Sequence, residues 1–156
     1  GELGSFSVNI DLSQKIPKEW LILTRATDLV NHGYYIESII IGYSLLEECA
    51  KRFFSQNMPN LNIEDAENFL QLIERGRLNA YFGCITKLCF GSAILDDKST
   101  KDNLKWLVNK RNGIIHEGRE CSLDDAKRGL EIVHGILNKM NEYKVTFSIP
   151  DKVEFW

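Results

Sequence analysis

The sequence predicts an all-α protein, a single helical bundle of about five to six helices with short extended segments at its N- and C-terminal ends. Apolar residues recur at intervals of three and four positions along most of the chain, which is typical of amphipathic helices. Alternation with a period of two, which favours strands, is confined to residues 6–12 and 145–156. At 156 residues, we expect one domain over 1–156 with its core at about 17–143.

The first two helices are indicated by their boundaries and their apolar stripes. Pro17 suits the first position of a helix that extends to about Asn31 and ends at His32-Gly33. A longer helix is expected over residues 34–54. Its apolar stripe consists of Ile36, Ile39, Ile40, Tyr43, Ala50 and Phe54.

Four further helices and a tail complete the expected order. Helices are predicted at about 63–75 and 78–90, and the second of these is apolar on most sides. Ser99 begins the next helix and Gly118 ends it, and Ser122 caps a last helix that extends to about Tyr143. A strand pairing with the N-terminal arm is one interpretation of the tail, and Pro150 would confine it to an edge. The stripe of the last helix consists of Ala126, Leu130, Val133, Leu137 and Met140.

Composition and spacing argue against several classes of protein. The net charge of −3 is unlike that of a general nucleic-acid binder, which is usually basic. The three histidines lie far apart without the spacing of metal ligands, so neither a metal nor another cofactor is expected. No apolar run approaches the length of a membrane span, and no signal-peptide pattern is present.

The four cysteines indicate a cytoplasmic protein. They contain no Cys-x-x-Cys pair, and two of them lie within apolar segments, so we expect free thiols in a reducing compartment. The chain begins with Gly1 and not with methionine, which is compatible with a domain excised from a larger protein. The cysteines are Cys49, Cys84, Cys89 and Cys121.

Residues 111–118, with the sequence Arg-Asn-Gly-Ile-Ile-His-Glu-Gly, are the most informative segment for function. An arginine such as Arg111 can hold a phosphate through two parallel charge-assisted hydrogen bonds. The imidazole of His116 can transfer a proton, and Asn112 adds a polar amide. An ordinary helix end is the alternative, because arginine and histidine often lie near the last carbonyls of a helix.

The place of Arg111 on its helix favours a functional role. With Leu104 as origin, Arg111 lies at about 340°, between the apolar Leu107 at about 300° and Val108 at about 40°. A guanidinium on a buried face needs a partner or a ligand. Glu47 projects from the apolar face of the 34–54 helix, so we expect Glu47 and Arg111 to approach each other, directly or across a subunit boundary. Such a pair either fixes the register of the helices or orients a phosphate-binding arginine.

In these residues and in its order of helices, the chain resembles a HEPN domain over about residues 17–143. Arg111, Asn112 and His116 match the Arg-x4-6-His motif that this superfamily carries late in a small helical bundle, with a polar residue after the arginine. A long amphipathic helix precedes the motif and a closing helix follows it, as in the family.

The resemblance implies a metal-independent endoribonuclease in which two motifs meet in a homodimer, as in a toxin, stress or phage-defence effector. His116 would move the proton during attack of a ribose 2′-hydroxyl on the phosphate. Arg111 would stabilise the developing negative charge, Asn112 would position the phosphate or the imidazole, and Glu47 would support the arginine. The RNA would be held by basic residues on or beside the motif helix, for which a solvated face is the alternative. These residues are Lys105, Lys110 and Arg119.

Other functions stay open within the same resemblance. An antitoxin or additional domains are possible partners, although Gly118 stands where one toxin branch has a tyrosine that its antitoxin modifies. A non-catalytic dimerisation or sensor module of a larger protein would form dimers and cut no RNA. A nucleotide-binding helical module would bind nucleotides without RNA turnover.

Overall fold

The computed structural model describes residues 15–57, 77–143 and 147–156. All regular elements in these ranges are helical, which confirms the predicted all-α fold class. The arm expected at residues 6–12 and the helix expected at 63–75 lie outside the described residues. The elements are α1 (Lys18–Asn31), α2 (Tyr35–Asn57), α4 (Arg77–Ala80), η1 (Tyr81–Ile85), α5 (Thr86–Phe90), η2 (Ile94–Asp96), α6 (Lys98–Glu117) and α7 (Leu123–Asn141).

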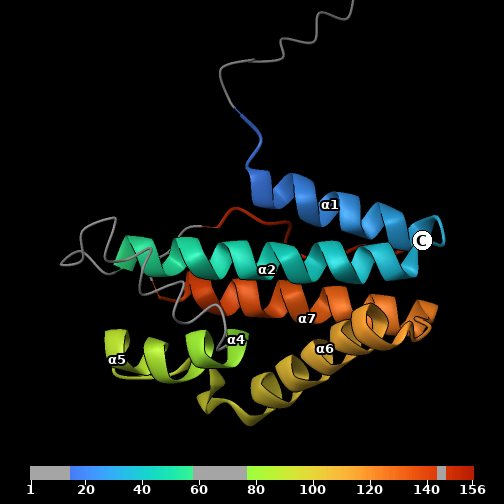
Figure 1. The fold of residues 1–156 in the computed structure, drawn as a ribbon. Helices are drawn as coiled ribbons and strands as arrows, with labels where there is room; N and C mark the ends of the chain where they lie inside the picture. The colour runs from blue at the N-terminus through green and yellow to red at the C-terminus, as the bar shows by residue number, and fades with distance from the viewer. Residues whose placement is uncertain (1–14, 58–76, 144–146) are drawn as a thin grey trace, which may run out of the picture.

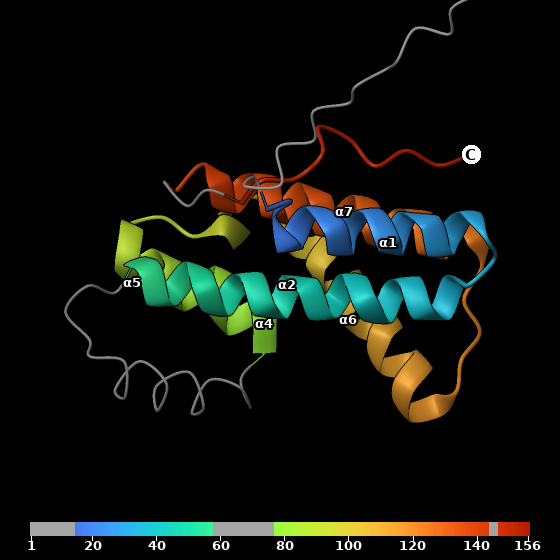
Figure 2. The same cartoon turned by 90° about the horizontal axis from the view of Figure 1, so that it is seen from above.

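Three long helices, α1, α2 and α7, lie side by side, and α4, α5 and α6 lie on the side away from α1 (Figures 1 and 2). Two glycines set the close approach of α2 and α7. A Cβ atom on Gly129 would lie 2.2 Å from Ile39 Cδ1, and one on Gly42 would lie 2.8 Å from Leu130 Cδ2. A larger residue at either position would therefore push the two helices apart or displace the facing side chain.

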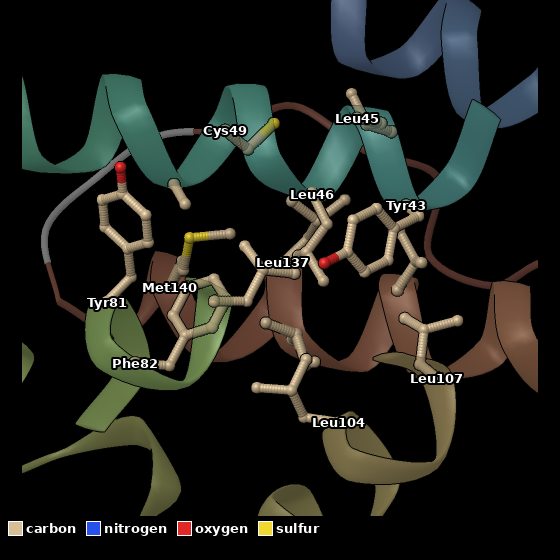
Figure 3. Close-up of a cluster of buried hydrophobic side chains, with 14 of the residues drawn as sticks. Tyr43, Leu45, Leu46, Cys49, Tyr81, Phe82, Leu104, Leu107, Leu137 and Met140 are labelled. Carbon is tan, nitrogen blue, oxygen red and sulfur yellow. The ribbon is translucent and has the colours of Figure 1, made fainter. Parts of the chain in front are cut away.

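Side chains from α2, η1, α6 and α7 meet in one apolar core (Figure 3). Leu46, Phe82, Leu104 and Leu137 are completely buried there. The stripe predicted for the last helix is buried in full, as expected from its periodicity. In the part of the chain that the structure describes, no helix combines the length and the apolar character needed to cross a bilayer.

The predicted helix at 78–90 forms, but one turn in its middle is a π-helix. Tyr81–Ile85 takes this wider turn, and the hydroxyl of Thr86 donates a hydrogen bond to the carbonyl of Tyr81, five residues earlier. Tyr81 and Phe82, the first two residues of this turn, are both buried. Apolar content predicts a helix here, but it does not distinguish a π turn from an α turn.

The ends of α6 and α7 follow the predicted signals with one correction. The cap of α6 is Asp97, whose carboxylate accepts the backbone N–H of Thr100 at 3.0 Å, and Ser99 already lies within the helix. Gly118 ends α6 in the left-handed conformation (φ 62°), as predicted. Ser122 and Asp125 form a reciprocal capping box at the start of α7.

Two large apolar residues of α2 and α6 are exposed, and the first of them, Ile36, belongs to a stripe that was expected to be buried. Ile36 is 39% exposed and Ile115 is 44% exposed. Each lies in a terminal turn of its helix, where the described neighbouring elements no longer cover it. Helical periodicity predicts which direction a side chain faces, but not how far along the helix the neighbouring helices extend.

The C-terminal tail is extended, but its described residues, 147–156, form no strand, which corrects that part of the interpretation. The reason is that side chains of α1 and α7 satisfy its backbone. Asn141 accepts the N–H of Phe147 at 2.7 Å and donates to its carbonyl at 2.9 Å, so it replaces a strand partner. Further contacts join Glu19 to Ser148, His134 to Pro150 and Asn31 to Trp156.

Candidate functional site

The predicted motif lies on the C-terminal half of α6. Helix α6 crosses beneath α2, and its last turns project away from the other helices (Figure 2). Arg111 and Asn112 are half-buried, whereas His116 is exposed. The structure therefore places the three residues on a projecting helix end, with the arginine toward the bundle and the histidine toward solvent.

The guanidinium of Arg111 is held by an aromatic ring. Its central carbon lies 4.8 Å from the centroid of the Tyr43 ring of α2, and Nη1 donates a 3.2 Å hydrogen bond to Asn112 Oδ1. A guanidinium has five N–H donors, and this is the one hydrogen bond that Arg111 makes to another described residue. The other donors make no hydrogen bond to the described residues, which leaves them for an anion such as a phosphate.

The expected approach of Glu47 to Arg111 does not form an ion pair within one chain. Among the described residues, neither side chain takes part in an ion pair within 4.0 Å. Arg111 instead covers Tyr43, one helical turn before Glu47 on the same face of α2. The predicted contact of Arg111 with this face of α2 forms, but its partner is Tyr43 and not Glu47. The ring of Tyr43 occupies the space beneath the guanidinium. An approach across a subunit boundary stays a prediction.

The predicted RNA-binding residues differ in whether a carboxylate already neutralises their charge. Lys110 forms a 2.6 Å ion pair with Asp125 at the start of α7 and is only 21% exposed. The hydrogen bond from Lys110 is the main cause of a lowered pKa at Asp125. Arg119 pairs with Glu117 at 2.6 Å on the surface. Lys105 is exposed and, among the described residues, has no carboxylate partner.

A groove of about 610 Å³ opens beside the motif, between η1/α5 and the face of α6 that carries Asn112. It contains three lysines, three amides and one carboxylate, over an apolar floor that includes Val108 and Leu95. Its carboxylate, Asp96, already accepts the backbone N–H of Ala93 at 2.9 Å. The polar lining residues are Asn79, Lys87, Asp96, Lys101, Lys105, Asn109 and Asn112.

Most of the residues that line this groove were not predicted from sequence. Lys101, Lys105, Asn109 and Asn112 recur at three- and four-residue spacing on one helix, a signal that could have identified one wall. Lys87 comes from a distant segment, and only the tertiary structure brings it to the same groove.

The other two histidines contact backbone carbonyls. His32 contacts the carbonyl of Asp28 at 2.7 Å at the end of α1, and His134 contacts that of Pro150 at 2.6 Å. Burial raises the pKa of the Cys49 thiol to about 11. Cys49, Cys89 and Cys121 are free thiols. In the described ranges, no three histidine, cysteine, aspartate or glutamate side chains gather as a metal site would require.

An assignment of function for this chain rests on the geometry of α6 and of the groove beside it. Comparison of the chain with protein-family models, with curated proteins and with solved structures finds no match.

Proposed function

We propose that this protein is a metal-independent endoribonuclease of the HEPN type, which cleaves RNA at a composite site in a homodimer. One observation carries the proposal: the guanidinium of Arg111 is held half-buried on Tyr43 and oriented by Asn112, five residues before the exposed His116. A fixed guanidinium with free donors suits the phosphoryl oxygens, and an exposed imidazole suits proton transfer.

The proposed reaction is an internal transesterification. The ribose 2′-oxygen loses its proton to one imidazole and attacks the adjacent phosphorus, while the bond from phosphorus to the 5′-oxygen breaks. A second imidazole gives a proton to that leaving oxygen, so the products are a 2′,3′-cyclic phosphate and a 5′-hydroxyl. Arg111 stabilises the extra negative charge on the phosphoryl oxygens.

The geometry of a single helix supports a dimeric site. Arg111 and His116 are five positions apart, which turns them about 140° from each other around α6. Their side chains therefore diverge, and a second copy of the chain would supply the acid or the base that a single chain lacks. The exposed Ile115, between them in sequence, offers apolar surface at the same end of α6.

A second candidate function is favoured by the groove. A volume of about 610 Å³ with three lysines also suits a nucleoside phosphate, as in a non-catalytic sensor or nucleotide-binding module. For the nuclease, the cellular setting we propose is a cytoplasmic toxin or defence effector, restrained by an antitoxin or by attached domains.

The test is cleavage of a labelled RNA of mixed sequence in the presence of EDTA. We expect cleavage by the wild-type chain, loss of at least a hundredfold in His116→Ala, and unchanged cleavage in His32→Ala, a histidine far from α6 in sequence. Mass spectrometry should identify 2′,3′-cyclic phosphate ends. Absence of cleavage by a folded, dimeric wild-type chain would exclude the nuclease, and nucleotide binding would then support the second function. Equal cleavage by all three proteins would indicate a contaminant.

A further inference from the structure

The polar face of α6 continues from the groove to the motif. Taking Lys101 as origin, Lys105 lies at about 40°, Asn112 at about 20° and His116 at about 60° around the helix axis. Val108 and Asn109 complete the same face at about 340° and 80°. One arc of about 100° therefore contains the groove wall and the proposed catalytic histidine, whereas Arg111 lies outside it.

The charge of this face is available to a ligand. Lys87, Lys101 and Lys105 are exposed, and in the part of the chain that the structure describes none of them pairs with a carboxylate. Lys110, which faces α7, is instead neutralised by Asp125. The groove thus holds three free positive charges against one carboxylate, in a chain whose net charge is −3. A local excess of this kind favours a polyanion at this place and not over the whole surface.

The length of the face favours a strand over a single nucleotide. Lys105 and His116 are eleven positions apart, which is about 16 Å along the helix axis. Lys101 lies a further turn away, and Lys87 of α5 lines the same groove. Lysines four residues apart on a helix are about 6 Å apart, which suits successive phosphates of one strand. None of the described lining residues is aromatic, so the groove would hold the backbone and would not select bases by stacking.

From this arrangement we infer that the groove is a subsite for the phosphodiester backbone of single-stranded RNA, several nucleotides away from the bond that is cut. Lys87, Lys101 and Lys105 bind phosphates, and Asn109 and Asn112 continue the contact toward His116. The inference rests on the proposed nuclease function, and it adds that efficient cleavage needs a substrate long enough to span the groove and the motif.

The first test compares substrates of different length. Lys101→Ala/Lys105→Ala should lower kcat/KM roughly tenfold for a single-stranded RNA of about 12 nucleotides. Cleavage of a dinucleoside monophosphate should stay unchanged, because such a substrate cannot extend from the motif to Lys101 and Lys105. The charge-matched control is Lys15→Ala/Lys152→Ala, at two exposed lysines outside the groove. An equal fall for the long and the short substrate would overturn the inference, and so would no fall for either.

The second test is independent of cleavage and uses RNA binding to His116→Ala at several salt concentrations. Each phosphate contact to a single strand contributes a slope of about 0.7 in log K against log salt. In the His116→Ala background, Lys101→Ala/Lys105→Ala should therefore lower the magnitude of this slope by about 1.4, and Lys87→Ala should lower it by about 0.7. Slopes equal to that of the control would refute the subsite even if the chain is a nuclease. If the wild-type chain cuts nothing, the nuclease fails, and the slopes still decide the subsite. Lysine-dependent binding of adenosine triphosphate without lysine-dependent RNA binding would replace the subsite with a nucleotide site.

Discussion

Replacement of Glu19 by glutamine should destabilise the fold at neutral pH. This carboxylate is 6% exposed and lies between α1, α2 and the C-terminal tail. Its two oxygens accept hydrogen bonds at 3.0 Å, one from Arg52 Nη2 and one from the backbone N–H of Ser148. Glutamine preserves the volume and one acceptor oxygen, so the change removes the charge and one hydrogen bond without creating a cavity.

The size of the loss follows from these contacts. A hydrogen bond to a charged group contributes about 1.5–3 kcal/mol, and glutamine keeps one of the two as a weaker, neutral bond. The side chain of Arg52 is 39% exposed, so water rehydrates the guanidinium after the substitution. This lowers the loss below that of a fully buried pair. We expect the free energy of unfolding to fall by about 2 kcal/mol, and Tm by roughly 5 °C for a chain of this size.

The difference between wild type and Glu19→Gln should depend on pH. Burial alone would raise the pKa of Glu19, but hydrogen bonds with its own backbone N–H, Arg52 and Ser148 outweigh burial and bring the pKa below its ordinary value of 4.5. Because the folded-state pKa is lowered, the stabilisation is complete above the unfolded-state pKa and is lost as the pH falls through the folded-state value. The difference should therefore shrink below about pH 4.5.

Urea unfolding followed by circular dichroism at pH 7 and at pH 3 measures both effects. The control is Glu48→Gln, which breaks another ion pair between α1 and α2. Lys18 and Glu48 are 2.7 Å apart, but their side chains are 64% and 42% exposed. A loss below about 0.5 kcal/mol is therefore expected in the control. Equal losses in the two variants, or a Glu19→Gln loss that persists unchanged at pH 3, would refute the reasoning.

Three further predictions concern packing, capping and thiol chemistry. Gly129→Ala should destabilise the protein by about 1–2 kcal/mol, because the added methyl group would lie 2.2 Å from Ile39 Cδ1 in a filled core. Asp97→Ala should lower Tm, because it removes the cap of the Thr100 N–H, whereas Ser99→Ala should leave Tm unchanged. Cys49 should resist iodoacetamide at pH 8 in the folded protein, because burial raises its pKa to about 11, and should react in urea.

Each of these predictions has an internal comparison. Gly135, also on α7, has open space around its Cβ position, so Gly135→Ala should stabilise the helix by up to about 1 kcal/mol. Stabilisation by both alanines would show that the α2–α7 contact is looser than described. A larger effect of Ser99→Ala than of Asp97→Ala would restore the cap predicted from sequence. Peptide mapping measures how far iodoacetamide has modified each cysteine. Modification of Cys49 in the folded protein at the rate seen in urea would contradict its burial.

The fold class and most helix boundaries could be predicted from sequence because their causes are local. Gly118 ends α6 since glycine adopts positive φ without strain, and Ser122 caps α7 since its hydroxyl reaches the N–H three residues later. Where two local signals compete, sequence alone is weaker. Asp97 and Ser99 are both good caps, and the chain uses Asp97.

Tertiary structure decided which charged residues are free, and this determines the candidate site. From sequence alone, Arg111, Asn112 and His116 could be placed together on the last turns of one helix, because helical spacing is a property of consecutive residues. Which residues pair across the fold depends instead on segments that are distant in sequence. Packing placed Arg111 on Tyr43 and not in an ion pair with Glu47, and it paired Lys110 with Asp125. It also brought Lys87 and Lys105 to the lining of one groove. Those partners depend on how far each helix extends along its neighbours. The apolar periodicity of one helix gives the direction in which a side chain faces, but not the residue of another helix that it meets.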